Sequence, residues 1–427
     1  MDHFHHRDHR LFGEDVDLVS LAETHGTPLF VYSKATLLEH YRRMAEAFAP
    51  IDPLICYAVK SNANLSVLEV LGNEGAGMDV VSGGELYRAL AAGVPAERCV
   101  YAGVGKTDSE IEYALSSGIG SINAESEEEI QAIADIADRL GMVAPVTIRV
   151  NPNVDPKTHH HTTTGTRATK FGIDYEKIPR IFSHFSRTPS LDLNGLHAHL
   201  GSPIYTTDPF VEGIQRLCSL ADQLQAEGNP IRKLDIGGGF AADYETGRAP
   251  TAAKYAEAIV PLLEQRVRDG LKVVIEPGRS IAANAGVLLL RVVVRKESGG
   301  RIFLVLDGGM NVLLRPSHYD AFHFAWPAEC ETVPSTRTES PDLPNLETVD
   351  LVGPICETGD FIARDRSFPP CRRGDLVAIY AAGAYGMTMA SRYNAMPLPA
   401  EVMVDGDQAT IIRRRESWED LVDHERS

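Results

Sequence analysis

Short apolar runs alternate with longer amphipathic stretches from about residue 54 to residue 280. The runs of strand length are 54–59, 77–81, 99–102, 121–124, 146–150, 195–200, 233–236 and 273–276. This alternation is typical of βα units with a parallel sheet, and eight repeats over roughly 230 residues match the size of a (β/α)8 barrel. The pattern therefore predicts an α/β fold built on a TIM-type barrel.

One of the amphipathic stretches carries boundary signals at both ends. Ser126 and Glu129 have the spacing of a capping box ahead of apolar positions 130, 133, 136 and 140, and Gly141 follows as a stop signal. This predicts a helix between the fourth and fifth runs.

The rhythm changes after residue 285, where strand-like runs follow one another without long helices. They are 286–295, 302–307, 350–353, 376–381, 401–404 and 409–413. A further strand-like segment, 28–33, precedes the barrel, and the Pro/Ser/Thr-rich stretch 334–348 is expected to be an exposed, mobile loop. We therefore expect a barrel domain at 34–283 and a mostly-β domain (β-barrel or sandwich) formed by 1–33 and 284–427.

The composition is that of an ordinary soluble globular protein, with 44% apolar and 23% charged residues among 427. The formal net charge of −18 disfavours nucleic acid and acidic membrane surfaces as partners. No apolar run reaches the roughly 18 residues that would cross a bilayer. The six cysteines are scattered without a C-x-x-C pair, and the histidine-rich clusters at 3–9 and 159–161 have no pattern of further ligands, so we expect a cytoplasmic protein without a metal site.

Reactive side chains follow the ends of the apolar runs, where barrel enzymes place their active sites. Lys60 follows the first run. A lysine leaving a buried strand loses its proton more easily and can attack a carbonyl group, although a lysine reaching to the surface is the simpler interpretation.

Gly237, Gly238 and Gly239 follow the seventh run. Their N–H groups can bind a phosphate, or the three glycines can form only a tight turn.

Two further runs end in ionisable residues. His197 and His199 are two positions apart and point to the same face of a strand. We interpret His197 as a hydrogen-bonded core histidine, whereas His199 can stack on a flat ligand. Glu276 either pairs with Arg279 or holds a proton on a heteroaromatic nitrogen. A reactive lysine, phosphate-binding amides, a stacking imidazole and such a carboxylate together suit pyridoxal 5′-phosphate.

Six motifs resemble those of the fold-type III pyridoxal-phosphate decarboxylases. They are YAVKSN around Lys60, HLGS at 199–202, GGGF at 237–240, EPGR at 276–279, CETGD at 356–360 and GAYG at 383–386. The resemblance covers about residues 10–425. Segments 151–173 and 307–323 are similar in particular to the members that act on meso-2,6-diaminopimelate.

The resemblance implies that Lys60 binds pyridoxal 5′-phosphate covalently, that His199 stacks on its ring, and that Glu276 pairs with its ring nitrogen. The other cofactor ligands that it implies are Ser202, Gly238, Gly278, Arg279 and Tyr385. Similar racemases have an arginine at the ring nitrogen. A carboxylate there keeps the nitrogen protonated, which favours decarboxylation over racemisation.

The resemblance also implies a homodimer with active sites at the subunit interface. Cys356 of the β domain would donate a proton to the substrate carbanion in the partner's site. The implied reaction converts meso-diaminopimelate to L-lysine and CO2. The residues expected to bind the substrate's second amino-acid head are Arg279, Arg315, Tyr319, Glu357 and Tyr385.

Three alternatives remain open at the level of sequence. The chain can be a related decarboxylase acting on ornithine, arginine or carboxynorspermidine. It can be a pyridoxal-phosphate carrier without turnover, against which the β domain, Cys356 and Glu357 argue. An inactive homologue would be expected to lack Lys60 or Cys356, and both are present.

Overall fold

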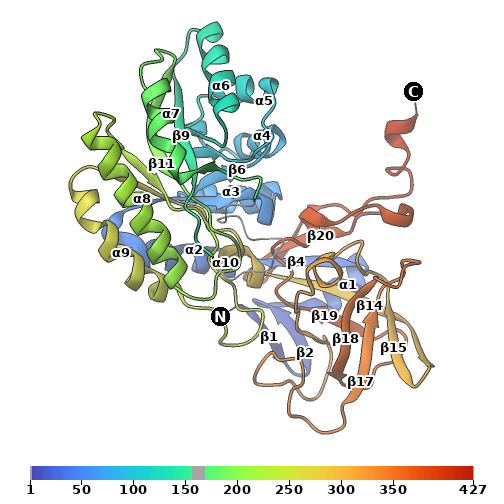
Figure 1. Ribbon diagram of the computed structural model, residues 1–427. Helices are drawn as coiled ribbons and strands as arrows, with labels where there is room; N and C mark the ends of the chain where they lie inside the picture. The colour runs from blue at the N-terminus through green and yellow to red at the C-terminus, as the bar shows by residue number, and fades with distance from the viewer. Residues whose placement is uncertain (1, 156–168, 427) are drawn as a thin grey trace. The chain divides into compact units, whose positions relative to one another are not determined.

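The computed structural model describes residues 2–155 and 169–426, so the histidines at 159–161 and most of the motif at 151–173 lie outside the described residues. Contacts divide the chain into two compact units (Figure 1). The barrel unit comprises His40–Ala241 and Pro250–Arg279, and the β unit comprises Met1–Glu39, Ala242–Ala249 and Ser280–Ser427.

The described residues of the barrel unit contain eight parallel strands that close into a ring. In order around the ring they are β5 (Leu54–Ala58), β6 (Gly77–Val80), β7 (Cys99–Tyr101), β8 (Ser121–Ala124), β9 (Ala144–Asn151), β11 (Leu191–His197), β12 (Lys233–Asp235) and β13 (Lys272–Ile275), which pairs with β5 again. A short strand, β10 (Ile173–Asp174), adds to β9. Each predicted run coincides with one strand of the ring, so the TIM-type barrel is confirmed.

Helices connect successive strands of the barrel. They are α2 (Lys34–Phe48), which enters the unit from the chain's start, α3 (Leu65–Asn73), α4 (Gly83–Ala91), α5 (Asp108–Ser116), α6 (Glu127–Leu140), α7 (Ile178–Phe185), α8 (Asp208–Ala226) and α9 (Ala252–Arg268). Ser126 caps α6 by accepting from the Glu129 amide, as predicted, but the Glu129 carboxylate accepts from the amide of Glu125. The complete capping box lies on α5, between Thr107 and Glu110.

The β unit is organised around an N-terminal strand, β4 (Leu29–Ser33), which lies between β14 (Gly286–Ser298) and β20 (Ala400–Asp405). The remaining strands of this sheet are β15 (Arg301–Leu306), β16 (Ala325–Pro327), β17 (Glu347–Val352), β18 (Phe361–Phe368), β19 (Leu376–Ile379) and β21 (Gln408–Arg413). A separate small sheet is formed by β1 (Phe4–Arg7), β2 (Arg10–Gly13) and β3 (Val16–Asp17), followed by α1 (Leu18–His25). The hydrophobic pattern did not reveal β18, whose sequence FIARDRSF contains three charges.

The core of the β unit is apolar and includes both sheet faces around β4 and β14. Phe30, Leu288 and Trp326 are among its fully buried members. The loop at 334–348 is tied to this unit, because the Arg337 amide donates to Thr246 Oγ1 at 2.8 Å and its guanidinium lies 4.3 Å from the ring centroid of Tyr380. Across residues 2–155 and 169–426, helices are too short or too polar to cross a bilayer.

Candidate active site

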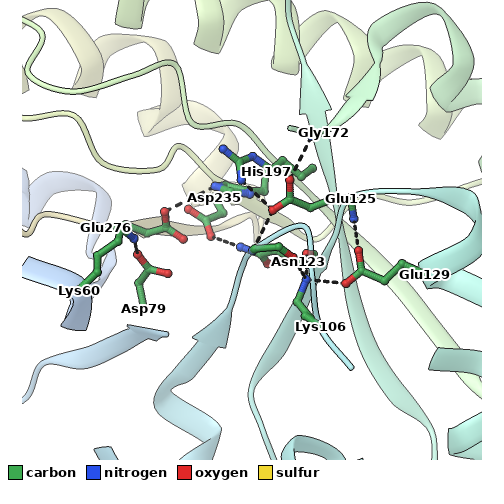
Figure 2. Close-up of polar contacts among 12 residues, drawn as sticks. Lys60, Asp79, Lys106, Asn123, Glu125, Glu129, Gly172, His197, Asp235 and Glu276 are labelled. Atoms are coloured by element: carbon green, nitrogen blue, oxygen red, sulfur yellow. Dashed lines mark hydrogen bonds and ion pairs between the residues drawn. The ribbon is translucent and has the colours of Figure 1, made fainter. Parts of the chain in front are cut away.

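Lys60 lies at the carboxyl end of β5, in a short 3-10 turn (Val59–Ser61). Its Nζ contacts the Oδ2 atom of Asp79 on the neighbouring strand β6, and Asp79 is completely buried (Figure 2). Burial and repulsion from Glu276 raise the pKa of Asp79, while Lys60 counteracts the rise. The side chain of Lys60 is therefore anchored by a buried carboxylate while remaining 36% exposed, which favours a role at the barrel mouth over that of an unanchored surface lysine.

Glu276 directly follows β13, the strand on the other side of β5. It is buried, and its Oε1 atom has no hydrogen-bond partner among the described residues. Its Oε2 atom lies 3.5 Å from Nε2 of His197. Burial by itself would raise the pKa of Glu276, but the attraction of His197, together with that of Lys60 and His199, outweighs burial and lowers the pKa. Glu276 is thus an ionised carboxylate with one oxygen available to a ligand.

His197 does not fit the interpretation as a hydrogen-bonded core histidine. It is 1% exposed, and within the described part of the chain neither ring nitrogen makes a hydrogen bond. Its neighbours are carboxylates: one ligand atom each of His197, Asp235 and Glu276 lie within 4.8 Å of one another. A buried imidazole without hydrogen bonds is costly unless it is charged and paired with such anions.

His199 lies just beyond the end of β11 and is half-buried. The Gly238 amide donates to its Nδ1 atom at 3.1 Å, so the ring's proton lies on Nε2. Burial, followed by the positive charges of Arg149 and Lys60, lowers the pKa of His199 to about 3. The imidazole is therefore neutral and flat, as stacking on an aromatic ring requires.

The predicted phosphate-binding glycines lie against the ends of neighbouring strands. A Cβ on Gly238 would lie 2.3 Å from the carbonyl oxygen of Glu276, and a Cβ on Gly278 would lie 2.8 Å from Cβ of Ala58. Close packing alone thus requires glycine at both positions, and the Gly238 amide is already bonded to His199. Nearby, Arg279 Nε donates to Ser202 Oγ at 3.1 Å, which brings two predicted ligands together.

In the β unit, Arg315 is the first residue of the short helix α11 (Arg315–Tyr319) and is 6% exposed. Its Nη1 lies 2.6 Å from Nε2 of His323, and its guanidinium carbon lies 4.6 Å from the ring centroid of Tyr244. His323 Nδ1 lies 2.9 Å from the carbonyl oxygen of Tyr380, which accepts the Nδ1 proton. Arg315 is therefore held in one orientation by an imidazole acceptor and an aromatic face.

The two predicted tyrosines occupy the ends of turns in the β unit. Tyr319 ends α11 and packs edge-on against His318, with ring centroids 4.5 Å apart. Tyr385 has a φ of +57°, a backbone conformation that costs a non-glycine residue of order 1 kcal/mol or more. Such strain at a half-buried tyrosine of a short loop is consistent with a ligand-binding role.

Cys356 and Glu357 lie in an exposed loop of the β unit. The Asn394 Nδ2 group donates to Cys356 Sγ at 3.2 Å, and the Tyr393 hydroxyl donates to Glu357 Oε2 at 3.2 Å. Asp360, at the end of the CETGD motif, is buried and accepts from the Ile355 amide at 2.6 Å, which anchors the loop that presents the thiol.

The predicted site residues fall into two groups. The barrel unit brings together Lys60, His199, Ser202, Gly238, Glu276, Gly278 and Arg279, while the β unit carries Arg315, Tyr319, Cys356, Glu357 and Tyr385. The sequence analysis missed Asp79, Asp235 and His323 and misread His197. For Asp79 a signal was present, because it is an acidic residue inside the otherwise apolar strand β6.

The barrel-unit residues fit pyridoxal phosphate. The group needs an amine for its aldehyde, a carboxylate for its ring nitrogen and a flat surface for its ring. Lys60 supplies the amine at the barrel mouth. Glu276 supplies a buried oxygen that lacks a partner within residues 2–155 and 169–426, and His199 supplies the neutral ring.

Comparison with known proteins agrees with this geometry. Residues 34–283 match the family model described as pyridoxal-dependent decarboxylase, pyridoxal binding domain. The chain is 45% identical to the diaminopimelate decarboxylase of Neisseria meningitidis serogroup B, with 97% of each chain covered. Among solved structures, it resembles the diaminopimelate decarboxylase of Helicobacter pylori complexed with L-lysine, with 37% identity, a TM-score of 0.89, and 96% of this chain and 99% of that chain covered.

A second solved structure, the diaminopimelate decarboxylase of M. jannaschii in co-complex with L-lysine, is 34% identical with a TM-score of 0.92 and covers 100% of this chain and 98% of its own. The fold, the site and the matched domain define a pyridoxal-phosphate-dependent decarboxylase. Over its full length, the chain belongs to the diaminopimelate decarboxylase family.

Proposed function

We propose that the protein removes CO2 from meso-2,6-diaminopimelate to give L-lysine, the last step of lysine biosynthesis, with Lys60 and Cys356 as its catalytic residues. The observation that carries the proposal lies on adjacent strands of the barrel. An ion-paired lysine after β5 lies beside a buried carboxylate after β13, and one oxygen of that carboxylate has no partner in the described part of the chain.

The barrel unit holds the cofactor in this proposal. Bound pyridoxal phosphate supplies an electron-poor ring that takes up the electron pair left when CO2 departs. Lys60 binds it covalently through Nζ, with Asp79 orienting the amine. Glu276 holds the proton of the ring nitrogen, and His199 stacks on the ring. Ser202, Gly238, Gly278 and Arg279 bind the phosphate and its surroundings, and Tyr385 of the β unit adds to them.

The β unit supplies the proton and reads the substrate in this proposal. Cys356 donates the proton of its Sγ atom to the α-carbon, and Asn394 keeps the thiol in place. The far end of meso-diaminopimelate carries a carboxylate and an ammonium group. Arg279, Arg315 and Tyr319 suit the carboxylate, and Glu357 suits the ammonium group.

We further propose a homodimer in which the loop of Cys356 and Glu357 completes the site of the partner subunit. Both residues are exposed in the single chain, as a loop that contacts a partner would be. Placement in the cytoplasm is also a proposal. It rests on cysteines that are scattered along the sequence and free as thiols in the described residues.

Turnover of purified protein on defined substrates tests the proposed reaction. L-lysine and CO2 are expected in equal amounts from meso-diaminopimelate in the presence of pyridoxal phosphate. Ornithine and arginine are expected to give little product, because their side chains end without the carboxylate that Arg315 would bind. Efficient decarboxylation of either one, with none of meso-diaminopimelate, would show that the substrate is wrong.

Substitution of the two catalytic residues tests their assignment. Lys60→Ala should lose the covalent cofactor and its visible absorption. Cys356→Ala should keep both while kcat falls by about 10²-fold or more, because only proton donation is removed. Lys254→Ala and Cys330→Ala are the matched controls and should behave as wild type. A Cys356→Ala variant that turns over at the wild-type rate would rule out the thiol as proton donor.

A further inference from the structure

Three consecutive strands of the barrel place three ionisable side chains next to one another. His197 ends β11 and pairs in register with Asp235 of β12, and Glu276 follows β13. All three are at most 4% exposed. Figure 2 shows His197 and Asp235 beside Glu276, on the side of the carboxylate away from Lys60.

With Asp235 neutral and Glu276 ionised, the three side chains have no net charge only if the imidazole of His197 carries a proton. Burial by itself would lower the pKa of His197, but Asp235 and Glu276 raise it above 6.5. Burial, and then repulsion from Glu276, raises the pKa of Asp235 to about 8. These directions favour a proton on His197 and on Asp235 and an ionised Glu276. When Asp235 carries a proton, the Glu276 carboxylate is the anion that faces the imidazolium, at 3.5 Å.

We propose that His197 is a positioning residue that acts as a buried imidazolium and keeps Glu276 ionised. The proton shared between Glu276 and the ring nitrogen of bound pyridoxal phosphate then stays on the nitrogen. The inference rests on the proposed function, in which Glu276 pairs with the ring nitrogen. It adds that His197 makes this buried carboxylate a weak base.

Without a cationic neighbour, burial would make Glu276 a stronger base than it is in water, and the proton would move from the ring nitrogen to the carboxylate. A neutral ring nitrogen withdraws electrons less strongly. Lys60 also attracts Glu276, but it is paired with Asp79. Arg149 is paired with Glu125 at 2.7 Å and opposes the protonation of His197. His197 is thus the cation that faces the Glu276 carboxylate directly.

Two neutral groups donate hydrogen bonds to the cluster and add no charge to it. The Asn123 Nδ2 group donates to Asp235 Oδ2 at 3.1 Å, and the Gly237 amide donates to Asp235 Oδ1 at 3.0 Å. The three side chains are also spaced closely enough to hold a metal ion. An imidazolium already compensates the carboxylate charge, so the proposal predicts that this cluster binds no metal.

The first test reads the protonation of His197 in the wild-type protein without cofactor. In ¹⁵N-histidine-labelled protein, the His197 ring is expected to remain doubly protonated at about pH 7. His197→Gln assigns the signal. A singly protonated His197 at this pH would overturn the proposal, as would a stoichiometric metal ion that is lost on His197→Gln.

The second test reports on the ring nitrogen itself. Protein is loaded with pyridoxal phosphate ¹⁵N-labelled at that atom, and its chemical shift is followed with pH. The wild type is expected to show a protonated nitrogen. His197→Gln should move the signal toward neutral pyridine and lower kcat by about tenfold or more with little change in KM.

A matched control separates this role from general damage to the barrel. Ser121→Ala removes an equally buried hydrogen bond, the 2.8 Å contact between Ser121 Oγ and Thr147 Oγ1, and should leave the ¹⁵N signal unchanged. If His197→Gln folds and keeps the wild-type signal, the role of His197 is refuted, while lysine production by the wild type leaves the proposed function standing. If the wild type itself makes no lysine, the proposed function fails independently.

Discussion

The imidazole of His323 is an acceptor that helps to orient Arg315. His323 donates through Nδ1 to the Tyr380 carbonyl, so its Nε2 is the acceptor that faces the guanidinium. Both side chains are buried, with His323 completely enclosed. A hydrogen bond to a buried charged group contributes about 1.5–3 kcal/mol, so this contact is strong enough to fix where the guanidinium points.

Replacing His323 should therefore weaken substrate binding more than catalysis. For His323→Leu we expect KM for meso-diaminopimelate to rise by about tenfold or more with a smaller change in kcat, because Arg315 loses its acceptor. His323→Gln, which can still accept, should restore part of the affinity. Steady-state kinetics measure both values.

His6→Leu is the matched control for this prediction. His6 is another histidine of the β unit that contacts a backbone carbonyl, that of Pro327 at 3.3 Å. It should leave KM unchanged. A wild-type KM in His323→Leu would mean that His323 does not position a substrate-binding arginine.

The carboxylate of Glu110 links the first turns of helices α4 and α5. Glu110 of α5 accepts from the Gly83 amide at 2.8 Å, at the start of α4, and from the Thr107 amide at 3.0 Å. These amide hydrogen bonds lower the pKa of Glu110 to about 2. A carboxylate whose folded pKa is depressed stabilises the fold above its unfolded pKa, and this contribution is lost as the pH falls.

The stability of Glu110→Gln should accordingly depend on pH. Near neutral pH the variant should be less stable by about 1 kcal/mol, a value discounted for partial exposure, and its Tm should be lower by about 1–2 °C for a chain of this size. The difference should shrink as the pH falls from 4.5 toward 2. Thermal unfolding at several pH values measures it. Glu128→Gln removes an exposed first-turn carboxylate of α6 and should show little difference; an equal, pH-independent loss in both variants would contradict the argument.

The protein as a whole has a negative net charge, whereas its proposed site binds the substrate through positively charged side chains. The formal net charge is −18, yet the substrate carries two carboxylates. Arg279 is 7% exposed and Arg315 is 6% exposed, so solvent screens their charges less than those of surface residues. Local positive potential at the site therefore does not require a positive surface.

Shared active sites in a homodimer predict complementation between inactive subunits. Lys60→Ala and Cys356→Ala protein, each nearly inactive, are mixed under conditions that allow subunits to exchange. Half of the dimers would then be mixed, each with one intact site of two, so activity should rise to about 25% of wild type. Coupled lysine release measures the recovery. A mixture that stays inactive despite demonstrated exchange would mean that both residues act within one subunit.

Much of the fold and the identity of the family followed from the sequence. Period and spacing located the eight barrel strands, and the residues directly after them, Lys60 and Glu276, indicated the cofactor. The structure and the comparisons confirm the barrel, the family and pyridoxal phosphate. The roles of individual residues, the domain boundaries at 34 and 283, the homodimer and the compartment stay predictions.

The tertiary structure alone decided which charges meet. The spacing of apolar residues in a helix or strand is set by residues close together in the chain, so it can be read from the sequence. The partners of Lys60, Glu276 and Arg315 are Asp79, His197 and His323, and two of these come from other strands of the barrel. Their protonation depends on burial and on neighbours from distant positions, which no local pattern contains. The sequence by itself therefore determined the barrel and its cofactor chemistry, and only the fold decided that the buried His197 lies 3.5 Å from Glu276, on which its proposed charge depends.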